Sequence, residues 1–107
     1  MPHFKSELDF QRAICLKAME NDWLVYCHPD SRKSAGYSTP GFPDIVLAKS
    51  GRLAFWECKL NDPPKPSEAQ RSWLSILPTK TRNRYTEIET RLVTPTNWTY
   101  IQHFLTE

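Results

Sequence analysis

The chain has 107 residues, of which 39% are hydrophobic and 24% charged, and its 14 Lys and Arg against 12 Asp and Glu give a net charge of +2. This composition is ordinary for a globular domain and excludes a disordered chain, which has fewer aromatic residues and more net charge. No apolar run approaches the ~20 residues of a membrane span, and residues 1–5 lack the apolar core of a signal peptide. We expect a single domain, over residues 1–107, in the cytoplasm.

The first third of the chain predicts a helix, a strand and a loop. Ser6 is a suitable helix cap, and apolar residues recur at helical spacing over residues 8–19. Residues 23–28 are rich in aromatic and β-branched types, which predicts a strand. The polar residues 29–40 that follow predict a long loop.

The middle of the chain predicts a β-hairpin. Residues 44–48 and 53–60 are two apolar runs of strand character. Between them, residues 49–52 read Lys-Ser-Gly-Arg, where glycine supplies the positive φ that a tight turn requires. We therefore expect the two strands to pair antiparallel, with Lys49 opposite Arg52.

The remaining residues predict two helices and a further strand. Ser67 can cap a helix that runs to Leu77, after a loop with three prolines. A basic loop then leads to a strand over residues 86–94 and a final short helix. The order α-β-β-β-α-β-α predicts an α/β fold of the α+β kind, a mixed sheet flanked by helices.

Charged residues interrupt the two apolar strands of the hairpin. Because the turn pairs Lys49 with Arg52, the same register places Asp44 opposite Glu57, and Lys59 shares the face of Glu57. Charges are seldom buried unless they are paired or bound to a metal ion. The opposite face of the hairpin is apolar and predicts core residues: Ile45, Leu47, Ala54, Trp56 and Cys58.

Two carboxylates this close repel one another unless a proton or a cation intervenes. Mg²⁺ suits such a pair, since it binds through one or two carboxylates and retains waters and substrate phosphates. A metal ion there would acidify its bound water and stabilise charge on a phosphate, and the Lys59 ammonium would hold the water or the phosphate. The alternative is a structural hairpin in which Lys59 only neutralises one acid.

The residues around the hairpin resemble the PD-(D/E)xK nuclease superfamily, and within it the VRR-NUC family of small virus-type replication-repair nucleases. Residues 41–44 (Gly-Phe-Pro-Asp) match GxPD, and residues 57–59 (Glu-Cys-Lys) match (D/E)xK. Gln70 matches the family's glutamine in the following helix, and Glu7 its glutamate in the first helix. Residues 93–98 resemble the closing strand and helix, so the resemblance covers the whole chain and implies a restriction-endonuclease-like core.

The resemblance assigns metal ligands to this chain. Asp44, Glu57 and the backbone carbonyl of Cys58 would bind Mg²⁺ or Mn²⁺. Glu7 would complete the acidic site, through a water molecule or as a ligand of a second metal ion. Glu7 also has a purely structural alternative, because an acid in a first helical turn stabilises the helix dipole.

The resemblance also assigns the chemistry, which is hydrolysis of DNA phosphodiester bonds. Lys59 would orient or activate the hydrolytic water, and Gln70 would position this water or the scissile phosphate. Family members of this size act on branched DNA, so the implied substrate is a four-way junction in replication, recombination or repair, inside a bacterial or phage-infected cell. Two strands need two active sites, which favours a homodimer.

Basic residues in the predicted loops are the expected DNA contacts, since phosphate contacts position a protein without reading sequence. Two rival functions stay open from the sequence. One is a DNA-binding or interaction module that keeps the nuclease fold without activity, and the other is a restriction-like nuclease with a defined recognition sequence. The expected DNA-binding residues are Lys80, Arg82, Arg84, Arg32, Lys33 and Lys65.

Overall fold

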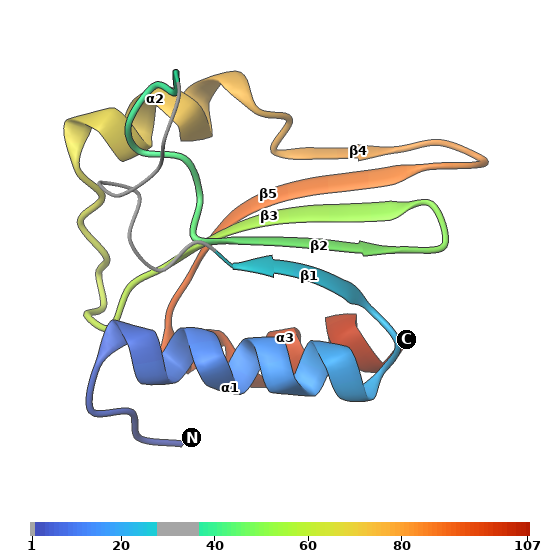
Figure 1. Ribbon diagram of the computed structural model, residues 1–107, viewed down its shortest axis with the longest axis horizontal. Helices are drawn as coiled ribbons and strands as arrows, with labels where there is room; N and C mark the ends of the chain where they lie inside the picture. The colour runs from blue at the N-terminus through green and yellow to red at the C-terminus, as the bar shows by residue number, and fades with distance from the viewer. Residues whose placement is uncertain (1, 28–36) are drawn as a thin grey trace.

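A computed structural model describes residues 2–27 and 37–107, and within these residues five strands form one mixed sheet in the order β1-β2-β3-β5-β4. Helices cover both faces of the sheet (Figure 1), which confirms the predicted mixed sheet flanked by helices. Strands β3 and β5 are parallel, and the other neighbours are antiparallel. The elements are α1 (Glu7–Glu20), β1 (Leu24–Cys27), β2 (Ile45–Lys49), β3 (Arg52–Cys58), α2 (Glu68–Ile76), β4 (Lys80–Arg82), β5 (Glu87–Val93), the short 3₁₀ helix η2 (Pro95–Asn97) and α3 (Trp98–Thr106).

The hairpin of β2 and β3 has the predicted register. Lys49 pairs with Arg52 and Ile45 with Trp56, around a turn in which Ser50 and Gly51 have φ of 46° and 80°. Two consecutive positive φ angles give the turn a twist that matches the twist of the strands. The two turn residues, Ser50 and Gly51, therefore set the register of the whole hairpin.

One face of the sheet carries the hydrophobic core, between the strands and helices α1 and α3 (Figure 1). Helix α1 begins at the Ser6 cap, whose hydroxyl accepts a hydrogen bond from the Asp9 N–H, as the sequence predicts. Trp23 is also buried in this core, where its ring stacks on Phe104 at 5.3 Å. All five residues predicted for the apolar face of the hairpin are fully buried: Ile45, Leu47, Ala54, Trp56 and Cys58.

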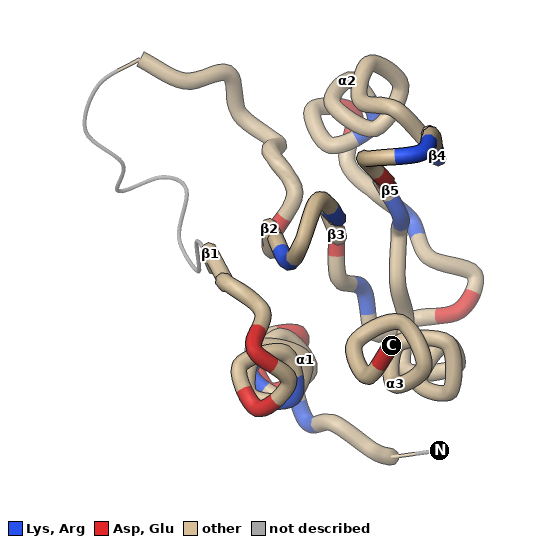
Figure 2. Tube along the Cα trace, turned by 90° about the vertical axis from the view of Figure 1, so that its right-hand side faces the viewer, with Lys and Arg blue, Asp and Glu red and all other residues tan. Residues whose placement is uncertain are grey.

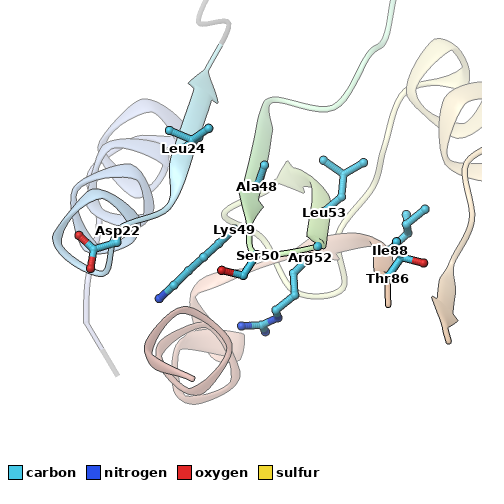
Figure 3. A pocket seen from close by; sticks show the side chains of 10 residues that line it. Asp22, Leu24, Ala48, Lys49, Ser50, Arg52, Leu53, Thr86 and Ile88 are labelled. Carbon is cyan, nitrogen blue, oxygen red and sulfur yellow. The ribbon is translucent and has the colours of Figure 1, made fainter. Parts of the chain in front are cut away.

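The other face of the sheet is only partly covered. Helix α2 lies over the end where β3 finishes, and Phe42 packs edge-on between Phe55 of β3 and Trp73 of α2. Around the hairpin turn lies a hollow of about 680 Å³, to which the apolar Leu24 and Leu53 contribute on this face, while the side chains of Lys49 and Arg52 point to the other side (Figure 3). The two ends of this face therefore differ, with aromatic packing at one and exposed apolar strands at the other.

Strand β4 was expected to be part of a basic loop. Its residues pair with β5, Lys80 opposite Glu89 and Arg82 opposite Glu87. Between the two strands the Asn83 side-chain oxygen accepts hydrogen bonds from the backbone N–H groups of Tyr85 and Thr86, and this short turn pairs a segment with no apolar alternation with β5. Within the described parts of the chain, no helix is long and apolar enough to cross a membrane.

Candidate active site

Asp44 and Glu57 meet where β2 begins and β3 ends. Asp44 directly precedes β2, and its Oδ2 accepts a hydrogen bond of 2.9 Å from the backbone N–H of Cys58. Glu57 is 1% exposed, and its Oε2 accepts a hydrogen bond of 2.8 Å from the Gln70 side-chain amide. Its other oxygen, Oε1, is buried, and no N–H or O–H group of residues 2–27 and 37–107 donates a hydrogen bond to it. In this site, Glu57 Oε2 is therefore bound by Gln70, while Glu57 Oε1 is available for another partner.

Burial is the largest cause that raises the pKa of Glu57 from its ordinary value of 4.5 to about 9. The neighbouring carboxyl group of Asp44 adds to the shift through its charge and as an acceptor with which protonated Glu57 shares its proton, and Glu7 adds a smaller repulsion. The positive charge of Lys59 acts in the opposite direction. At neutral pH the acidic pair therefore holds a proton unless a cation takes its place.

Lys59 follows β3 and lies beside this pair. Its Nζ is 3.9 Å from Glu57 Oε2, and its side chain is 17% exposed. The backbone N–H of Lys59 donates to the Val93 carbonyl, which continues the pairing of β3 with β5 by one residue. Pairing with β5 thus fixes the backbone of Lys59, while its partly exposed side chain places the ammonium next to the carboxylates.

A hollow of about 580 Å³ opens beside Lys59. Glu7, at the start of α1, and Lys65 also line it, together with residues 60–63. Glu7 lies close enough to Glu57 to influence its charge. Within residues 2–27 and 37–107, however, no three His, Cys, Asp or Glu side chains gather closely enough to hold a metal ion together. A ligand role of Glu7, directly or through a water molecule, stays a prediction.

Gln70 contacts Glu57 with a defined orientation of its amide group. Its Oε1 accepts a hydrogen bond of 2.8 Å from the Ser67 N–H, while the Ser67 hydroxyl accepts one from the Gln70 N–H. Since the amide oxygen is used in this capping box, the amide nitrogen is the group that faces Glu57. In the structure Gln70 binds the Glu57 carboxylate, and its predicted contact with water or the scissile phosphate stays a prediction. The Ser-x-x-Gln spacing at positions 67–70 is the signal from which this orientation could have been predicted.

The expected DNA-binding residues lie in separate places. Lys65 lines the hollow beside Lys59. Lys80 and Arg82 line a different hollow, of about 780 Å³, next to α3 on the core side of the sheet. Figure 2 shows these basic residues of β4 at the sheet edge, and the order of strands puts β3 and β5 between them and β2. Arg84 follows β4, in the turn that leads to β5. Two expected contacts, Arg32 and Lys33, lie outside the described residues.

Comparison of the chain with protein-family models, with curated proteins and with solved structures finds no match in any of the three. What the protein does is therefore inferred from its residues and their geometry.

Proposed function

We propose that the protein is a metal-dependent DNA endonuclease with the PD-(D/E)xK core of the VRR-NUC family. The observation that carries the proposal is the position of Glu57 Oε1, which is buried beside the Asp44 carboxyl group with no donor group of the described residues to bind it, while the Lys59 ammonium lies 3.9 Å from the other oxygen. A buried carboxylate oxygen without a hydrogen-bond donor is costly, and a cation shared with Asp44 would remove both that cost and the repulsion.

The residues fit Mg²⁺ or Mn²⁺. Each carboxylate has one oxygen held by the chain, Asp44 Oδ2 by the Cys58 N–H and Glu57 Oε2 by Gln70, so that the second oxygen of each is the proposed ligand. The Cys58 carbonyl is the proposed third oxygen, and two carboxylates are enough for Mg²⁺, which retains several waters. When bound, such an ion stabilises charge on a phosphate and makes a water molecule more acidic.

The remaining residues act on the substrate or on the carboxylates. Lys59 donates a hydrogen bond to the attacking water or to a phosphate oxygen, where its charge stabilises the negative charge that develops in the transition state. Lys65, at the rim of the same hollow, contacts the neighbouring phosphate. Gln70 keeps Glu57 in one orientation by holding Oε2.

Branched DNA, with a four-way junction as the preferred form, is the proposed substrate. The proposed enzyme is a homodimer, because the described part of each chain offers the one pair Asp44 and Glu57 and two symmetric cuts need two active sites. Contacts to phosphates alone do not read bases, so recognition depends on the shape of the DNA.

Cleavage assays test the proposed function. Supercoiled, linear, forked and four-way-junction DNA are incubated with Mg²⁺, Mn²⁺ or EDTA. We expect cleavage with either metal ion, fastest on the junction, and none in EDTA. Asp44→Asn and Glu57→Gln should each lower the rate by about 10³-fold, since several kcal/mol of transition-state stabilisation depend on the ion. Asp22→Asn, an acid in the hollow at the hairpin end, is the matched control and should cleave normally.

Two other outcomes would contradict the proposal. DNA retained without metal and never cleaved would favour a binding module that keeps the fold. Product ends that are identical on several templates would favour a restriction-like nuclease with a recognition sequence.

A further inference from the structure

The backbone at Gly41 touches helix α2 directly. Gly41 has φ of +96°, and a Cβ atom placed on it would lie 2.4 Å from the carbonyl carbon of Ala69 and 2.7 Å from the backbone nitrogen of Gln70. Real Cβ atoms do not approach backbone atoms this closely, so any side chain at this position has to displace α2 or the loop. Only glycine permits the observed separation between the two segments.

Two aromatic side chains, Trp73 and Phe42, stabilise the same contact between the loop and α2. The indole N–H of Trp73 donates to the carbonyl oxygens of Thr39 and Pro40, at 3.1 Å each. The ring of Phe42 meets Trp73 edge-on at 5.0 Å, with an angle of 88° between the planes, and also contacts Phe55 of β3. Residues 39–42 therefore attach α2 to the sheet next to the carboxylates.

Gln70 lies within this contact. Its backbone nitrogen is one of the atoms nearest to Gly41, and its side chain ends on Glu57. The hydrogen bond between Gln70 Nε2 and Glu57 Oε2 is 2.8 Å long, so a shift of α2 by about 1 Å would take the pair beyond hydrogen-bonding distance. The distance between α2 and residues 39–42 thus decides whether the Gln70 side chain can form its hydrogen bond with Glu57.

We propose that Gly41 is a positioning residue of the candidate active site, which acts through Gln70 to keep Oε2 of Glu57 bound and Oε1 directed at the metal ion. This inference rests on the proposed function, because the metal ion is the group that benefits from the orientation. Gly41 itself touches neither ion nor substrate. Its effect on the site is therefore measured through metal affinity and through Gln70.

The test compares Gly41→Ala with Gly51→Ala. Gly51 also has a positive φ, of +80°, and its Cβ would lie 2.6 Å from the Tyr85 carbonyl oxygen, but it sits in the hairpin turn at the opposite end of β3. Both variants should lower the melting temperature. We expect only Gly41→Ala to weaken Mn²⁺ binding, by about 10- to 100-fold, as is typical when a partner of a metal ligand is lost. Equal losses in both variants, or none in Gly41→Ala, would overturn the proposal.

A double-mutant cycle distinguishes an effect of Gly41 that acts through Gln70 from a loss of metal affinity caused by general destabilisation. If Gly41 acts through Gln70, the double variant Gly41→Ala/Gln70→Ala should bind Mn²⁺ as Gln70→Ala alone does. Losses that multiply would contradict the proposal. Should Gly41→Ala fail to fold, Trp73→Phe replaces it in the same cycle, because it removes the indole hydrogen bonds while keeping an aromatic ring.

A readout without metal keeps this inference distinct from the proposed function. The side-chain amide resonances of Gln70 in the ¹H–¹⁵N spectrum should move toward those of a solvated glutamine in Gly41→Ala and stay in place in Gly51→Ala. If the wild-type protein binds no Mn²⁺, the proposed function fails, and with it the purpose of the positioning. If it binds Mn²⁺ while the Gln70 resonances stay unchanged in Gly41→Ala, the positioning fails and the nuclease proposal stands.

Discussion

The carboxyl group of Glu57 has different proton affinities in the folded and the unfolded chain. Burial and the nearby Asp44 raise its pKa from 4.5 to about 9 in the folded protein, while the unfolded chain leaves the group solvated. Between these two values the folded state binds more protons than the unfolded state, so the free energy of unfolding decreases as pH rises. This contribution is fully present below pH 4.5 and is lost progressively up to about pH 9.

Glu57→Gln should remove this pH dependence, because an amide has the shape of the protonated acid and does not titrate. In EDTA, the melting temperature of the wild-type protein should fall between pH 5 and pH 9 more steeply than that of Glu57→Gln, and the variant should be the more stable one at pH 8. Mn²⁺ should raise the melting temperature of the wild-type protein only. If calorimetry showed the same dependence of melting temperature on pH for both proteins, the pKa of Glu57 would not be raised in the folded state.

Lys59 differs from the carboxylates in its relation to the proposed metal ion, because its ammonium and the ion would both be positively charged. Lys59→Met keeps most of the side-chain length and removes the ammonium that lies 3.9 Å from Glu57. Cleavage should fall by about 10²- to 10³-fold, as when one donor to a developing negative charge is lost. Mn²⁺ affinity, measured by titration calorimetry, should stay the same or increase because a repulsive charge is gone. A loss of affinity with an unchanged cleavage rate would assign Lys59 to structure instead of chemistry.

At the scale of elements, the hairpin of β2 and β3 was predictable because its information is local. The Ser50-Gly51 turn sets the register, and alternation of apolar and charged residues then sets the face on which Glu57 and Lys59 lie. The structure confirms this register, and the same short range of sequence brings Asp44 next to Glu57. Half of the candidate site thus follows from a single turn.

The other half was not predictable from local patterns. Gln70 reaches Glu57 because the parallel connection from β3 to β5 passes through α2, and because Gly41 lets α2 approach the loop before β2. Strand β4 was missed for a different reason, since residues 80–82 show no apolar alternation and pair with β5 across a short turn in which the Asn83 side-chain oxygen accepts from the N–H groups of Tyr85 and Thr86. The Gln70 contact joins segments distant in the sequence, whereas the β4 pairing is local and lacks only the alternation of residue types that predicts a strand.

At the scale of the whole molecule, the described residues that were expected to bind DNA fall into two groups, near opposite ends of β3. Lys65 shares a hollow with Lys59, whereas Lys80 and Arg82 line the hollow beside α3. The protein measures 33 × 32 × 26 Å. Under the proposed function, a straight duplex across the carboxylates would contact Lys65 at the end of β3, and a second arm of branched DNA would reach Lys80 and Arg82 of β4.

Charge reversal tests this division of contacts. Lys65→Glu should weaken binding to plain duplex and to a four-way junction alike, while Lys80→Glu/Arg82→Glu/Arg84→Glu should weaken binding to the junction and leave the duplex unaffected. Dissociation constants are measured in EDTA at several salt concentrations, and each lost phosphate contact should flatten the slope of log K against log salt by about 0.9. Equal losses on both DNAs would place β4 on the path of a single duplex. Unchanged slopes on both would remove β4 from the DNA interface and with it the structural reason for a preference for branched DNA.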